Sequence, residues 1–163
     1  MSNEPSGVLI IDKPGGWTSH DVVAKARGLT RIRQIGHAGT LDPMATGVLV
    51  LCVGKATRLL EYLVGQPKSY QAEITLGVAT DTYDADGQAV AVQPVPELSP
   101  AALEAALDPF RGDIHQTPPA YSAIKRDGVA AYQRARRGEA VQLEPRPVTI
   151  YRSCRSTARC ANG

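Results

Sequence analysis

Aromatic residues and long apolar runs are scarce in this sequence of 163 residues. Aromatic side chains make up 5% of it, with one Trp and one Phe. No stretch approaches the ~20 apolar residues that a membrane span requires, and residues 1–6 lack the basic and apolar regions of a secretory signal. We therefore expect a cytoplasmic protein with no membrane segment. A hydrophobic content of 43% suits one ordinary globular domain.

Cysteine is also scarce, with three residues in a spacing that fits no metal site. Cys52 lies inside an apolar run and is expected to behave as a small hydrophobic residue, whereas Cys154 and Cys160 lie near the end of the chain. We expect no disulfide framework. The acidic turn at 81–87 contains part of a calcium-loop pattern without its closing Glu, so we expect no metal there.

Positive charge is unevenly distributed, although the net charge is only +2. Residues 71–110 hold seven acids and no Lys or Arg, and residues 111–163 hold ten basic and four acidic residues. Residues 22–70 hold two acids and seven basic residues, which are Lys25, Arg27, Arg31, Arg33, Lys55, Arg58 and Lys68. The two basic blocks suit a groove for a phosphate backbone. The alternative is a set of solvated faces of mixed sign.

Apolar periodicity predicts strands and helices in mixed order along the whole chain. Expected strands lie at 7–12, 48–53, 70–76, 120–125 and 141–151. Expected helices run from an N-cap at Ser19 to about Gly28, over 56–64, from Ser99-Pro100 to Leu107, and over 129–137. Residues 30–46 are expected to form a long functional loop. This order favours an α+β fold with a largely antiparallel sheet.

One Gly-bounded segment, GHAGTLDPMATG at residues 36–47, directly precedes the expected core strand. An acid on a loop that leads into a rigid strand occupies a common place for a catalytic group. Pro43 fixes its own backbone and restrains Asp42 to an extended conformation. The alternative is that Asp42 only helps to form a turn.

The same segment resembles the catalytic motif of the TruB-type tRNA pseudouridine synthases, G-H-x-G-T/A-L-D-P-x-A-T/S-G-x-L. Further similar blocks are GVLIIDKP from Gly7, KSY from Lys68, TDTYDADG from Thr80, FRG from Phe110 and YSAIK from Tyr121. The resemblance covers roughly residues 7–152. It implies the pseudouridine synthase catalytic fold, which is α+β with a mixed, largely antiparallel sheet and flanking helices.

The resemblance also implies an activity, namely conversion of uridine to pseudouridine at position 55 in the TΨC arm of tRNA. The target uridine must first leave its stack. Asp42 is then the expected nucleophile, and Tyr70 the platform that stacks on uracil and helps to move a proton. The reaction needs no cofactor and no metal. We expect tRNA as the partner of a monomeric enzyme, without an obligate protein partner.

Three further residues are candidates for RNA contacts. The resemblance places His37 near the flipped base, and the alternative is a loop histidine bonded to the backbone. Lys13 and Lys125 are candidates for pairing with phosphates or acids, and the alternative is that both are ordinary surface lysines.

The resemblance stops after Tyr151-Arg152. The family's second signature, of the kind S-K-G-T-Y-I-R, supplies an arginine that pairs with the aspartate, and this sequence has no such string. We therefore expect a flexible segment at 1–6, a partial catalytic domain at 7–152 and an atypical, disordered tail at 153–163. Two rival functions stay open: an RNA-binding fragment or tRNA folding aid without catalysis, and an RNA-guided relative within a larger particle.

Overall fold

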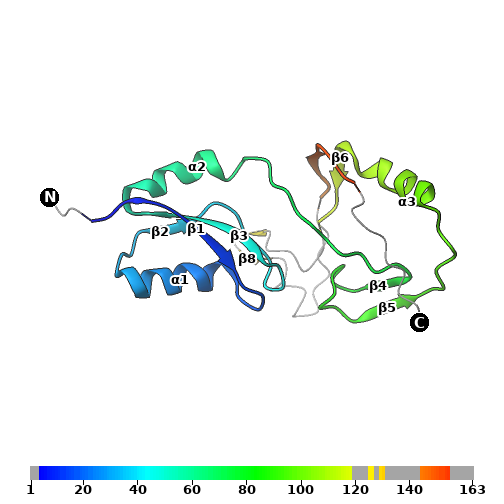
Figure 1. Ribbon diagram of the computed structural model, residues 1–163, viewed down its shortest axis with the longest axis horizontal. Helices are drawn as coiled ribbons and strands as arrows, with labels where there is room; N and C mark the ends of the chain where they lie inside the picture. The colour runs from blue at the N-terminus through cyan, green and yellow to red at the C-terminus, as the bar shows by residue number, and fades with distance from the viewer. Residues whose placement is uncertain (1–3, 119–124, 127–128, 131–143, 155–163) are drawn as a thin grey trace. The chain divides into compact units, whose positions relative to one another are not determined.

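A computed structural model describes residues 4–118, 125–126, 129–130 and 144–154 (Figure 1). The chain divides into two compact units, Met1–Gln71 and Ala72–Gly163. Within the described residues both units combine short helices with antiparallel strand pairs. The expected α+β class with antiparallel pairing is confirmed. None of the helices in this part of the chain combines the length and apolar character that crossing a bilayer requires.

The first unit is built on a three-stranded sheet with the order β1-β3-β2. Strands β1 (Gly7–Lys13) and β3 (Gly47–Val53) pair antiparallel from Gly7 opposite Val53 to Lys13 opposite Gly47. The short strand β2 (Ile35–His37) pairs with the other edge of β3. Residues 30–46 are therefore not a continuous loop, because β2 lies inside them.

Helix α1 (Ser19–Thr30) has its N-cap one residue earlier than Ser19, the N-cap predicted from the sequence. Its N-cap is Thr18, whose hydroxyl accepts from the Asp21 amide at 3.0 Å, while the Asp21 carboxylate accepts from the Thr18 amide at 2.8 Å. This reciprocal capping box explains the choice of Thr18, since its partner acid stands three residues later. The helix continues past Gly28 to Thr30, and its C-cap, Arg31, adopts the left-handed conformation with a φ of 60°.

The core of the first unit lies between α1 and one face of the sheet. It is formed by seven buried aliphatic residues, which are Val22, Val23, Ile32, Ile35, Leu49, Leu51 and Val53. On the other side of the sheet, the 3-10 helix η1 (Gly54–Leu59) leads into the short helix α2 (Leu60–Leu63) (Figure 1). The single helix expected over 56–64 is thus a 3-10 helix followed by a short α-helix.

The second unit holds two larger strand pairs among its described residues. Strand β4 (Val78–Thr80) pairs with β5 (Ala89–Val92) across the acidic turn, and β6 (Gly112–Gln116) pairs with β9 (Arg146–Ile150). Helix α3 (Pro100–Leu107) has Ser99 as its N-cap, as predicted, and η2 (Asp108–Phe110) follows it.

Two sequence predictions in the second half were wrong. Residues 70–76 form no strand, because the apolar members of their alternating pattern remain exposed and find no partner strand. A helix was expected from Val129, but Val129–Ala130 form β8, paired with β7 (Lys125–Arg126). The rest of that helix, and residues 120–124 and 141–143 of the expected strands, lie outside the described residues.

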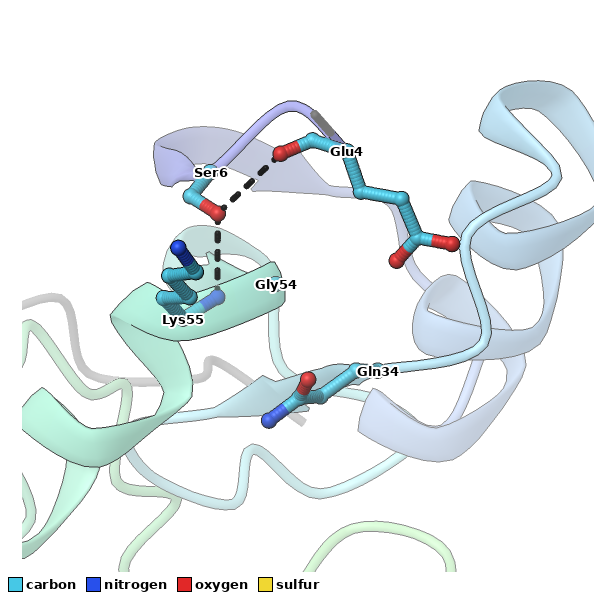
Figure 2. Close-up of a pocket in the computed structure, with 5 residues that line it drawn as sticks. All are labelled: Glu4, Ser6, Gln34, Gly54 and Lys55. Atoms are coloured by element: carbon cyan, nitrogen blue, oxygen red, sulfur yellow. Dashed lines mark hydrogen bonds between the residues drawn. The ribbon is translucent and has the colours of Figure 1, made fainter. Parts of the chain in front are cut away.

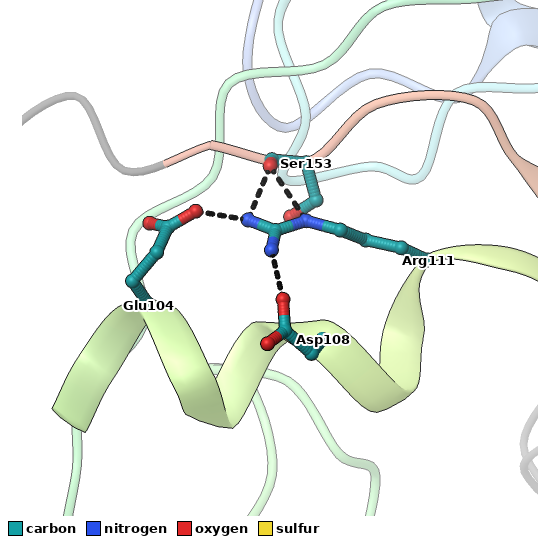
Figure 3. A network of polar contacts seen from close by, with 4 residues as sticks. All are labelled: Glu104, Asp108, Arg111 and Ser153. Atoms are coloured by element: carbon teal, nitrogen blue, oxygen red, sulfur yellow. Dashed lines mark hydrogen bonds and ion pairs between the residues drawn. The ribbon is translucent and has the colours of Figure 1, made fainter. Parts of the chain in front are cut away.

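Arg111 holds three segments of the second unit together (Figure 3). Its guanidinium pairs with Glu104 on α3 and Asp108 on η2. It also donates from Nη2 to the carbonyl of Ser153 at 2.7 Å, just beyond β9. The hydrogen bond that Arg111 donates to the Glu104 carboxylate is the main reason that the pKa of Arg111 is raised above its ordinary value. This network gives the FRG block a structural role in packing α3 and η2 against the end of β9.

Candidate active site

Asp42 lies on an exposed turn in the loop that joins β2 to β3. Its carbonyl accepts from the Ala45 amide at 3.1 Å, which closes a β-turn with Pro43 in the second position. The ends of the loop are fixed to the sheet, because the Ala38 amide donates to the Val50 carbonyl at 2.9 Å and Gly47 is the first residue of β3. Asp42 therefore does form a turn, and that turn presents its carboxylate on a rigid base.

Both neighbours of Asp42 are held by the segment that joins β1 to α1. The Ser19 hydroxyl accepts from the Leu41 amide at 2.9 Å and lies 3.3 Å from the Leu41 carbonyl. The Gly16 amide donates to the Pro43 carbonyl at 2.8 Å. We call residues 13–19 the clamp segment, since it fixes the backbone on either side of the carboxylate.

Lys13 is the buried centre of the clamp segment. Its side chain has no exposed surface, and its ammonium donates to the carbonyls of Pro14 at 2.9 Å, Trp17 at 2.6 Å and Pro43 at 3.1 Å. An ammonium group has three donors, and all three are used. The structure thus gives Lys13 a different place from the expected contact with a phosphate or acid. It ties the end of β1 to the residue that follows Asp42.

His37 ends β2, half-buried, and lies opposite Leu51 of β3. Its Nδ1 atom is 2.7 Å from the Gly39 carbonyl. Because a carbonyl oxygen only accepts, Nδ1 carries the hydrogen in this contact. A neutral imidazole then keeps Nε2 as an acceptor. The backbone bond considered as the alternative is present.

Tyr70 lies on an irregular segment with its side chain 67% exposed. This segment approaches the motif at Lys68, whose Cε atom would be 3.0 Å from a Cβ atom placed on Gly39. A larger residue at position 39 would therefore displace the lysine stem. Lys125 pairs with Ala130 in the β7–β8 hairpin. The expected contact of its side chain with a phosphate or an acid lies outside what the structure describes.

Two pockets lie at the opposite end of the sheet from Asp42. One, of about 180 Å³, is shown in Figure 2, and its lining residues are Glu4, Ser6, Gln34, Gly54 and Lys55. The other, of about 430 Å³, is mainly apolar and borders the start of β1. Both adjoin the Gly7–Val53 end of the strand pair, whereas the clamp segment adjoins the Lys13–Gly47 end. Six residue steps of strand separate these ends by roughly 20 Å.

Sequence reasoning missed the clamp segment, although it found Asp42. The signal that was available is the adjacent hydroxyl pair Thr18-Ser19 in front of a helix. Only one hydroxyl can cap the helix, and the other is then free for a tertiary hydrogen bond. Here Thr18 caps α1 and Ser19 binds Leu41.

The fold and the site together define a class: an α+β protein that presents one exposed carboxylate on a rigidly anchored loop. The family model described as "TruB family pseudouridylate synthase (N terminal domain)" matches residues 27–159. This match covers more than half of the sequence, so the chain belongs to the TruB pseudouridylate synthase family.

Similar curated proteins carry the name tRNA pseudouridine synthase B. The protein of Thermobifida fusca (strain YX) is 55% identical over 145 residues, which are 89% of this chain and 50% of that protein. The protein of Opitutus terrae is 51% identical over 147 residues, which are 90% of this chain and 61% of that protein. The chain thus spans about half to three fifths of the length of these relatives.

Two solved structures are also similar. A chain of "Crystal Structure of a Cbf5-Nop10-Gar1 Complex" is 29% identical with a TM-score of 0.48, over 74% of this chain and 31% of that chain. A chain of "Structure of H/ACA RNP bound to a substrate RNA containing 2'-deoxyuridine" is 25% identical with a TM-score of 0.45, over 74% of this chain and 34% of that chain.

Proposed function

We propose that this chain forms the aspartate-bearing part of an enzyme that isomerises uridine to pseudouridine in tRNA, at position 55 of the TΨC arm. The observation that carries the proposal is Asp42 itself, exposed on a turn whose two flanking residues are fixed by the clamp segment. The relatives named tRNA pseudouridine synthase B support the substrate. We further propose that the enzyme works as a monomer in the cytoplasm and without a cofactor.

The reaction moves one bond within the nucleotide. The glycosidic bond from ribose C1′ to uracil N1 breaks, the base turns, and a new bond joins C1′ to C5. C5 loses its proton and N1 gains one, so the product is an isomer of the substrate. An ionised carboxylate at Asp42 attacks the electrophilic sugar or base, forms a covalent adduct and is released when the new bond is complete.

Open presentation of Asp42 suits a macromolecular substrate. Asp42 is exposed, so the carboxylate meets its target at the surface. A uridine that has left its RNA stack reaches such a surface at a cost of a few kcal/mol. The exposed ring of Tyr70 then offers a face for the base, and His37 Nε2 offers an acceptor.

The test uses a chimera in which residues 1–152 are followed by the remaining C-terminal part of the Thermobifida fusca relative. The substrate is tRNA labelled with tritium at uridine C5, since bond formation at C5 releases the label. We expect release by the chimera and none by its Asp42→Asn variant. Glu61→Gln, an acid on α2 outside the site, is the matched control and should keep the parent rate. Release by Asp42→Asn at the parent rate would reject the proposal.

A further inference from the structure

Trp17 is the only tryptophan of the chain, and it lies in the clamp segment beside the Asp42 turn. Its side chain is 39% exposed although tryptophan is a large apolar residue. The core of this unit is made of aliphatic residues instead, and Trp17 is not among them. Part of the surface of Trp17 is therefore open to solvent, on a segment whose preceding residue, Gly16, is bonded to the neighbour of Asp42, Pro43.

The backbone of Trp17 is fixed relative to Asp42 by shared hydrogen bonds. The Lys13 ammonium donates both to the Trp17 carbonyl at 2.6 Å and to the Pro43 carbonyl at 3.1 Å. On the chain before Trp17, the Gly16 amide donates to Pro43 at 2.8 Å. On the chain after it, Thr18 caps α1 and the Ser19 hydroxyl accepts from the Leu41 amide. Trp17 is thus held between the anchors of the two residues that flank Asp42.

We propose that the indole of Trp17 stacks on an unpaired RNA base next to the reacting uridine. The inference rests on the proposed function, because it assumes an RNA strand at Asp42. When a uridine leaves its stack, its neighbours lose a stacking partner. A partly exposed aromatic ring on a rigid segment replaces that partner without a requirement for base identity. Trp17 then stabilises the opened RNA loop, while Tyr70 stacks on the target base itself.

The experiment uses the chain of 163 residues and a synthetic stem–loop RNA with the TΨC-arm sequence. Because Trp17 is the only tryptophan, its emission reports contact at this position directly. We expect the RNA to quench or shift this emission, and an RNA with abasic nucleotides on both sides of the target uridine to do so much less. Affinity is measured separately, by anisotropy of a dye on the RNA.

Substitutions then assign the effect to the ring. Trp17→Leu should weaken RNA binding about five- to 150-fold, as the loss of one stacked base implies. Trp17→Phe should recover part of this loss. The carbonyl that binds Lys13 belongs to the backbone, so both variants keep that bond. Tyr62→Leu removes an aromatic ring on α2 that is more exposed than Trp17, and this variant should bind RNA like the parent. In a double-mutant cycle, Trp17→Leu should not distinguish the abasic RNA from the intact one.

The outcomes separate this inference from the proposed function. RNA binding with unchanged tryptophan emission, or with equal affinity for the parent and Trp17→Leu, overturns the stacking role and leaves the proposed function intact. If Trp17→Leu has a lowered melting temperature, the tryptophan emission of the parent with intact and abasic RNA decides the question without this variant. A parent chain that binds the stem–loop no better than an unrelated polyanion overturns both.

Discussion

Replacing Lys13 with methionine tests whether the clamp segment holds the Asp42 turn. Methionine keeps the length and the apolar stem of lysine but removes the ammonium, and therefore removes all three hydrogen bonds to the carbonyls of Pro14, Trp17 and Pro43. Lys13 has no exposed surface, so its ammonium is taken out of water and depends on these three bonds.

The magnitude follows from two opposing terms. Hydrogen bonds to a charged group contribute about 1.5–3 kcal/mol each, so the three bonds together stabilise the fold by several kcal/mol. Removing the ammonium also removes the desolvation penalty of a buried charge, which is itself several kcal/mol. We expect a net loss near 3 kcal/mol from the free energy of unfolding, comparable to breaking a buried ion pair.

Thermal and urea unfolding of the chain measure this loss. For a unit of this size, about 3 kcal/mol corresponds to a fall in melting temperature of roughly 10–25 °C. Lys55→Met is the matched control, because Lys55 is an exposed lysine of the same unit, and its melting temperature should change little. In the chimera, Lys13→Met should also lower tritium release at temperatures where the protein is still folded, because the turn that carries Asp42 loses an anchor.

Equal melting temperatures for Lys13→Met and Lys55→Met would refute this reasoning. The ammonium would then contribute no more than a surface charge. Unchanged release by a folded Lys13→Met chimera would refute the positioning role alone.

Three further predictions concern the first unit. Tyr70→Ala should lower turnover of the chimera far more than Tyr70→Phe, because the ring contributes ~1–3 kcal/mol of stacking; equal losses would assign the work to the hydroxyl. Thr18→Ala should lower the free energy of unfolding by about 1 kcal/mol in urea. The bond from Thr18 lowers the pKa of Asp21 below its ordinary value of 3.8, so the stabilisation by Asp21 is complete above that value and is lost as pH falls through the lower folded pKa; Asp21→Asn should remove this acid dependence. RNA affinity should fall steeply with salt as phosphate contacts release counterions, and a flat plot of log affinity against log salt would contradict RNA binding by the basic block at 22–70.

Local patterns predicted those parts of the fold that depend on nearby residues. The apolar runs at 7–12 and 48–53 predicted strands that the structure extends by one residue each, and Ser99-Pro100 predicted the start of α3. The alternating pattern at 70–76 failed because a strand also needs a partner edge, which the pattern does not contain. Strand β2 was missed because three residues, one of them Gly36, are too few to show a periodicity.

The motif predicted Asp42 as the candidate catalytic residue. The hydrogen bonds that hold the neighbours of Asp42 could not be predicted from the sequence. The bond from Lys13 to Pro43 joins residues thirty positions apart, and that from Ser19 to Leu41 joins residues twenty-two positions apart. Such contacts arise from the β1–β3 pairing, which brings Lys13 opposite Gly47. The buried place of Lys13 could not be inferred from its charge, since lysine is almost never fully buried unless its donors are paired.

The most direct test of the central claim measures tritium release and RNA affinity together for the chimera and its Asp42→Asn variant. We predict that Asp42→Asn abolishes release while its affinity for the stem–loop RNA stays close to that of the parent, because the substitution removes an ionised nucleophile and leaves the turn and the basic residues in place. Release at the parent rate by a pure Asp42→Asn preparation would contradict the claim that Asp42 is the nucleophile of a pseudouridine synthase.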